Sequence, residues 1–219
     1  MSKTNTPLET QPMDAGSMVT AERHVLADAL FNAGPDAPTL CEGWQTRHLL
    51  AHLILRESKP DAVAGIALPF LADRTDRLTN EYADKLRDED VYEDAINTFV
   101  ELPGYFKMRE NRPQLDANMN LIEYFVHIED IRRADGQWEP RKLQPEIQQK
   151  MWAALTKRAR LMAGKKYKDG LVLAAPGYSP DSVTVISPKP GQHATVLTGE
   201  PGELVLYLFG REQARVQAS

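Results

Sequence analysis

The amino-acid sequence predicts a mainly α protein that ends in a small α+β unit. Apolar residues recur at helical spacing through most of the first 163 residues. After Gly164 the pattern changes to short runs rich in β-branched residues, separated by turn segments such as PGYSPD and PKPGQH. With 219 residues, of which 42% are hydrophobic, the chain is long enough to bury a substantial core.

Each helix is predicted from an apolar face bounded by turn or capping residues. The expected helices cover residues 18–32, 46–57, 61–73, 76–87, 91–102, 115–134 and 145–162. In the second of them, leucine and isoleucine occupy most of the circumference, so we expect this helix to lie at the centre of the fold.

The C-terminal part is expected to hold three short strands and one helix. The strands cover residues 171–175, 182–187 and 194–199, and the helix follows in GEPGELVLYLFGRE, with Pro201 in its first turn. We divide the chain into a disordered tail (residues 1–16), a helical bundle (17–163) and a small α+β domain (170–215) that docks on the bundle because it is too short to be stable alone.

Composition excludes several classes of protein. The net charge of −5 does not favour nucleic-acid binding, which requires a concentrated basic surface. A single cysteine, Cys41, rules out an internal disulfide and suits a reducing cytoplasm. The polar N-terminus lacks the apolar core of a signal peptide, and no run approaches the roughly 18 apolar residues of a membrane span. We therefore expect a soluble, cytoplasmic protein.

The most informative feature is an E-x-x-x-H pair, Glu123 and His127, in a segment that otherwise has the pattern of a buried helix. Residues four apart lie on one helix face, and Asn120 and Asp130 fall within the same sector of roughly 80°. Apolar or aromatic residues border this sector: Tyr124, Val126 and Ile131. Buried carboxylates and imidazoles are costly unless they are paired, hydrogen-bonded or bound to a metal. The stripe thus predicts either a metal site or a buried Glu–His pair that ties helices together.

A metal site needs a third ligand from another element. His52 lies on the central helix between Ala51 and Leu53, where an imidazole requires a polar partner. His48 and His52 are also four residues apart and form a rival pair, which we rank lower because His48 is near the helix start. His24 and His193 show no pattern. Cys41 is either a nucleophile or, more in keeping with its place in a turn beside Trp44, a packing residue.

Three segments together resemble the mycothiol-dependent maleylpyruvate isomerase N-terminal family, within the wider DinB-like superfamily. TLCEGWQTRHLLAHLILRE resembles the early motif, EYFVHIEDIRRADGQWEPR the second motif, and GEPGELVLYLFGRE the C-terminal segment. In their particular residues the motifs resemble an actinobacterial branch of the family rather than the isomerase itself.

The resemblance implies a DinB-like four-helix bundle followed by a small C-terminal α+β domain. It implies a divalent metal, usually zinc (Zn²⁺), held by His52, Glu123 and His127, and mycothiol as a thiol cofactor. It also implies a catalytic arginine, for which Arg211 in LFGRE is the candidate; otherwise Arg211 is a cation favoured at a helix C-terminus. Asp130 or Asn120 would form a hydrogen bond to one of the metal-binding side chains and orient it.

The leading hypothesis is a zinc- and mycothiol-dependent isomerase or S-transferase that activates a thiolate on the metal. It would act on a small-molecule substrate, as a monomer or homodimer. The alternatives are a non-catalytic metal-binding or small-molecule-binding module of the same fold, and a hydrolase that uses zinc-bound water. Motifs for other chemistries, such as G-x-S-x-G, the P-loop or G-x-G-x-x-G, do not occur.

Overall fold

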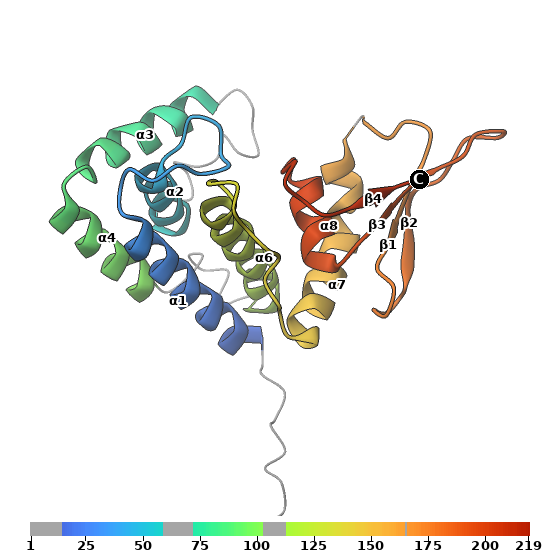
Figure 1. Cartoon of the computed structure of the whole chain (residues 1–219), viewed down its shortest axis with the longest axis horizontal. Helices are drawn as coiled ribbons and strands as arrows, with labels where there is room; N and C mark the ends of the chain where they lie inside the picture. Colours follow the sequence, from blue (N-terminus) through green and yellow to red (C-terminus); the bar gives the residue numbers. More distant parts are fainter. Residues whose placement is uncertain (1–14, 59–71, 103–112, 165) are drawn as a thin grey trace, which may run out of the picture.

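The structure is a computed structural model, and it describes residues 15–58, 72–102, 113–164 and 166–219. Its helices, labelled as in Figure 1, are α1 (Ala15–Ala33), α2 (Thr46–Ser58), α3 (Ala72–Lys85), α4 (Glu89–Glu101), α6 (Pro113–Arg132), α7 (Pro145–Ala163) and α8 (Pro201–Leu208). Its strands are β1 (Leu171–Ala174), β2 (Ser182–Ile186), β3 (Thr195–Thr198) and β4 (Gln217–Ala218). The predicted mainly α fold with a small C-terminal sheet is confirmed.

Helices α1, α2, α4 and α6 form the bundle. Helix α1 packs along α6 and also contacts α2 and α4, while α3 covers α2 from outside (Figure 1). Fully buried leucines fill the centre, among them Leu26 and Leu30 of α1 and Leu49, Leu50 and Leu53 of α2. The expectation that the second helix is central is confirmed, since nearly all of α2 is buried.

A buried polar network fixes how the bundle helices meet. Arg23 of α1 donates to the Glu57 carboxylate of α2 at 2.7 Å, to the Tyr124 hydroxyl of α6 at 2.6 Å and to the Phe99 carbonyl of α4 at 2.5 Å. Tyr124 in turn donates to Glu57 at 2.5 Å. Because an unpaired charge here would be costly, the network favours one arrangement of the four helices.

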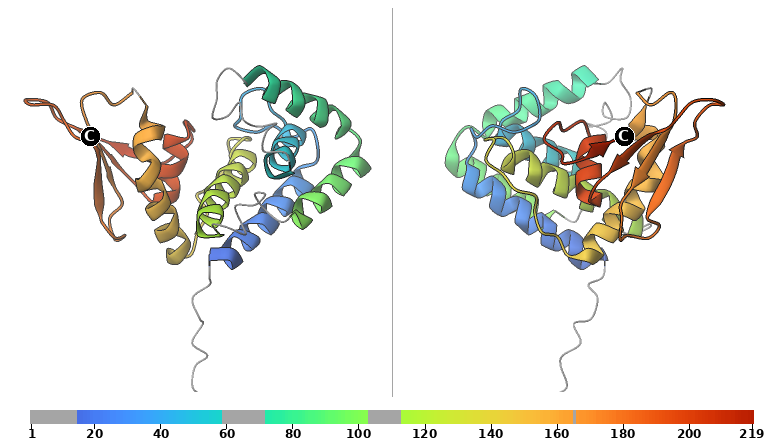
Figure 2. Two further views of the ribbon diagram at one scale, coloured as in Figure 1. Left: turned by 180° about the vertical axis from the view of Figure 1, so that it is seen from behind. Right: turned by 45° about the vertical axis from the view of Figure 1, so that its right-hand side comes forward.

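The C-terminal unit is a four-stranded sheet in the order β2-β1-β3-β4, with β1 and β3 parallel and the two outer pairs antiparallel. Helices α7 and α8 lie between this sheet and α6 in each view (Figures 1 and 2). Leu171, Leu173 and Leu197 are fully buried within this unit. Helix α7 contacts α8 and β2 as well as α6, so it packs with the C-terminal unit although the sequence analysis grouped it with the bundle.

The boundaries differ from prediction in a few places. Helix α1 begins at Ala15, so the last two residues of the expected tail (1–16) are helical, and residues 1–14 lie outside the described part. The expected helix at 61–73 also falls mostly outside it. Strand β4, of two residues, was not predicted. No helix among the described residues is long and apolar enough to cross a bilayer.

Two bidentate ion pairs attach the C-terminal unit to α6, and they have opposite polarity. Arg133, directly after α6, binds both carboxylate oxygens of Glu203 in the first turn of α8, at 2.7 and 3.0 Å. Asp130, one turn earlier on α6, accepts two hydrogen bonds from Arg211, which follows the end of α8, at 2.7 and 2.8 Å. A shifted register would bring like charges together, so this pattern selects one docking position.

Candidate metal-binding site

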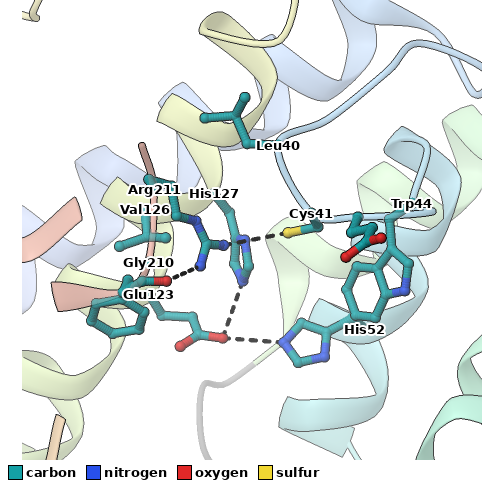
Figure 3. Close-up of a pocket in the computed structure, with 11 residues that line it drawn as sticks. Leu40, Cys41, Trp44, His52, Glu123, Val126, His127, Gly210 and Arg211 are labelled. Carbon is teal, nitrogen blue, oxygen red and sulfur yellow. Dashed lines mark hydrogen bonds and ion pairs between the residues drawn. The ribbon is translucent and has the colours of Figure 1, made fainter. Parts of the chain in front are cut away.

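The central helix α2 and the stripe on α6 meet at three ligand-capable side chains. The Glu123 Oε1 atom lies 3.1 Å from Nε2 of His52 and 3.3 Å from Nε2 of His127 (Figure 3). One ligand atom from each residue lies within 4.8 Å of the others. The structure therefore brings together the three residues proposed from the sequence, His52, Glu123 and His127, from two separate helices.

Burial and charge set the protonation of two of these groups. Both imidazoles are buried, whereas the Glu123 side chain keeps 20% of its surface exposed. Burial lowers the pKa of His52, which favours its neutral form. Burial alone would raise the pKa of Glu123, but the Arg56 guanidinium and the two imidazoles hold it well below its usual value. A neutral imidazole and an ionised carboxylate are the forms that bind metals.

Asp130 holds His127 from behind. Its Oδ2 atom lies 2.9 Å from Nδ1 of His127, so the other ring nitrogen, Nε2, points to Glu123. Burial alone would lower the pKa of His127, but hydrogen bonds with Asp130, Cys41 and Glu123 raise it well above its usual value. The raised pKa favours a His127 ring with a proton on both nitrogens. A metal ion that binds at Nε2 would have to displace the proton there. The pair of carboxylate and imidazole has the arrangement that orients histidine ligands in metalloproteins.

Arg211 lies in the wall of the site, but its planar donor edge faces Asp130. Its Nε and Nη2 atoms donate to Asp130, Nη1 donates to the Phe209 carbonyl at 2.7 Å, and Nη2 lies 3.4 Å from the Cys41 sulfur. Arg211 thus satisfies a carbonyl at the end of α8, as expected of a cation there, and it also lines the pocket. Its catalytic role stays a prediction.

Cys41, His127 and Asp130 form a second group that is close enough to share a cation. Arg211 already lies against two of its members and supplies the positive charge that the Asp130 carboxylate needs. For this reason we favour His52, Glu123 and His127 as the metal-binding group.

His48 does not join either group among the described residues. Its Nδ1 atom accepts a hydrogen bond from the backbone amide of Gln45 at 3.1 Å, which occupies that ring nitrogen at the start of α2. The structure therefore gives no support to the rival pair of His48 and His52.

The His48→Ala variant is expected to purify with as much divalent metal as the wild-type protein, because His48 is held by the loop before α2. Metal content per chain, measured by elemental analysis after dialysis, checks this. His52→Ala is the matched control on the same helix and should lose the metal. Loss of metal in His48→Ala would indicate that His48 and His52 bind the metal together.

The side chains of His52, Glu123 and His127 line a pocket with a volume of about 410 Å³. Its walls come from the 40–44 loop, α2, α6 and the segment after α8: Leu40, Cys41, Glu42, Trp44, His52, Glu123, Val126, His127, Phe209, Gly210 and Arg211. The volume falls in the range of small-molecule sites. The bundle thus supplies the ligand groups, and the C-terminal unit supplies one wall.

Sequence reasoning missed several residues of this site. Trp44 was treated only as a packing neighbour, yet its ring lies 5.4 Å from that of His52 and lines the pocket. Arg56 was given no role, although it pairs with Glu123 at 3.4 Å. Its position four residues after His52, on the same helix face, was the signal that could have shown this.

Comparison with known proteins bears on the N-terminal part of the chain and on the fold. The sequence model of the mycothiol maleylpyruvate isomerase N-terminal domain matches residues 19–102. This part of the chain is similar in sequence to that domain. The resemblance recognised from the motifs is thereby confirmed. The matched residues include His52 but end before α6. Glu123 and His127 therefore lie outside the match.

Two crystal structures of the mycothiol-dependent maleylpyruvate isomerase, one of them a histidine-to-alanine mutant, have a similar fold. Each is 20% identical in sequence, and the match covers 94% of this chain and 93% of that chain, with TM-scores of 0.57 for the mutant and 0.55 for the other. The likeness therefore extends past the N-terminal domain through the C-terminal unit. No curated protein matched the sequence.

Proposed function

We propose that the protein binds one zinc ion at His52, Glu123 and His127 and is a mycothiol-dependent isomerase or S-transferase acting on a small molecule. The observation that carries this proposal is the convergence of two imidazoles and a carboxylate at the edge of a pocket large enough for a ligand. The N-terminal domain and the overall fold indicate a protein like the mycothiol-dependent maleylpyruvate isomerase.

The residues fit a zinc ion with an open position. Two histidines and one glutamate are a ligand set of catalytic zinc, which keeps its fourth position for water or substrate. All three groups line the pocket, and the exposed part of Glu123 shows that the set is not closed off. A structural zinc site, by contrast, takes four protein ligands.

The chain's own residues prepare the site. Asp130 fixes the ring of His127, and Arg56 keeps Glu123 ionised. Arg211, held by Asp130, presents a fixed positive charge at the pocket wall, and we propose it as the catalytic residue that binds a carboxylate of the substrate. When bound, zinc favours the thiolate form of mycothiol, which can attack an electrophilic carbon in an isomerisation or S-transfer.

Cobalt substitution tests this function. We expect Co²⁺-loaded protein to change its absorption spectrum toward thiolate ligation when mycothiol is added, because the open position accepts the sulfur. His52→Ala protein, treated in the same way, should give no such change. A wild-type spectrum that mycothiol leaves unchanged would contradict the thiol mechanism and favour a hydrolase or a binding module.

A further inference from the structure

A second hollow, of about 420 Å³, adjoins the metal pocket. It is formed by the loop before α2: Asp36, Pro38, Thr39, Cys41, Glu42, Gly43, Trp44 and Gln45. Cys41, Glu42 and Trp44 line both spaces, so the hollow continues the pocket along the protein surface. A ligand bound at the metal and longer than the pocket can extend into this hollow.

The loop that forms the hollow is held in shape without a ligand. The Thr39 hydroxyl donates to the Trp44 carbonyl at 2.9 Å and accepts from the Cys41 amide at 3.2 Å. The amide of Leu40 donates to the Asp130 carbonyl of α6 at 3.0 Å. Because these bonds satisfy the backbone of the loop, its side chains are placed before binding, which lowers the entropy that a ligand must overcome.

The hollow carries an excess of negative charge that comes from one residue. Asp36 is paired with Arg47 of α2, so their charges cancel. Glu42 is exposed, and its carboxylate has no hydrogen-bond or ion-pair partner among the described residues. Since Glu42 lies where the hollow meets the metal pocket, any bound molecule that spans the two passes close to its charge.

We infer that this hollow receives the part of the thiol cofactor beyond its sulfur, and that Glu42 selects a neutral, hydroxyl-rich thiol over an anionic one. The inference rests on the proposed function, since it assumes a thiol at the metal. Hydroxyl groups donate to a free carboxylate, and the Trp44 ring offers a flat apolar surface beside it. A carboxylate on the ligand would instead meet the charge of Glu42.

The test compares two thiols on the full-length, Co²⁺-loaded protein: mycothiol, which is neutral and hydroxyl-rich, and glutathione, which carries a net negative charge. Affinities come from titrating the cobalt spectrum. The Glu42→Gln variant removes the charge and keeps the shape. Glu93→Gln, which removes another exposed carboxylate, on α4, is the matched control.

We expect Glu42→Gln to bind glutathione more tightly by roughly fivefold, the ratio that about 1 kcal/mol of repulsion between nearby charges in water gives. Mycothiol binding should weaken in this variant, because an amide accepts hydroxyl groups less strongly than a carboxylate. Added salt should strengthen glutathione binding to the wild-type protein and have less effect on Glu42→Gln, since salt screens exposed charges. Glu93→Gln should behave as wild type.

The outcomes separate the two claims. If both thiols change the cobalt spectrum but Glu42→Gln alters their affinities no more than Glu93→Gln does, selection by Glu42 is wrong and the thiol mechanism stands. If neither thiol changes the spectrum of the wild-type protein, the proposed function is overturned, and the selection with it.

Discussion

His127→Ala is expected to purify with no stoichiometric divalent metal, whereas the wild-type protein should contain close to one ion per chain. The variant removes one of three ligands and leaves His52 and Glu123, and two ligands rarely hold a metal. Elemental analysis after dialysis against metal-free buffer measures the difference. Thermal unfolding followed by circular dichroism should show that the variant is folded.

His127 belongs to both candidate groups, so a second variant is needed to separate them. Cys41→Ala removes a member of the Cys41–His127–Asp130 group only, and it should keep its metal if the ion binds at Nε2 of His127. Full metal retention in His127→Ala would reject both groups. Loss of metal in Cys41→Ala would indicate instead that the ion binds at the group of Cys41, His127 and Asp130.

Glu203→Ala is expected to lower the free energy of unfolding by about 1.5–3 kcal/mol, the range for a lost hydrogen bond to a charged group, because Arg133 keeps Glu129 as an ion-pair partner at 2.6 Å. The side chain of Arg133 is only 1% exposed and that of Glu203 8%, so the guanidinium would lose a bidentate partner where water reaches it poorly. Glu203 also accepts the backbone amide of Arg215 at 2.7 Å. Urea unfolding curves measure the loss.

Arg77→Ala provides the control for this prediction. It breaks the Arg77–Glu81 ion pair on α3, whose side chains are 62% and 57% exposed, and it should change stability little because exposed pairs are screened by water. An equally small effect of Glu203→Ala would show that the Arg133–Glu203 pair does not hold the C-terminal unit on α6.

Local patterns were sufficient to predict most of the secondary structure. The helices that became α1, α2, α4, α6 and α7 have apolar residues at helical spacing, and Pro201 lies at the start of α8 as expected. Strand β4 was missed because its two residues are exposed and take their conformation from pairing with β3, which no short-range pattern reveals. The packing of α7 against β2 and α8 likewise depends on contacts between residues far apart in the sequence, so local patterns do not predict it.

The meeting of His52, Glu123 and His127 could be predicted because burying their side chains is unfavourable without partners. An imidazole on a leucine-rich helix and a Glu–His pair on another each require a partner, and the structure places them together. The roles of Arg211 and Glu203 could not be predicted in the same way. Each forms a pair with a residue in or directly after α6 that is more than 65 positions away, and many charged residues were available as partners.

The pocket is lined by two separate parts of the fold, and this affects how its ligand preference can change. The ligand groups come from α2 and α6, whereas residues 209–211 contribute a wall from a different structural layer. Substitutions in that short segment can therefore change which molecules fit the pocket while His52, Glu123 and His127 keep their positions. A new ligand preference in this fold thus requires only a handful of changed residues after α8.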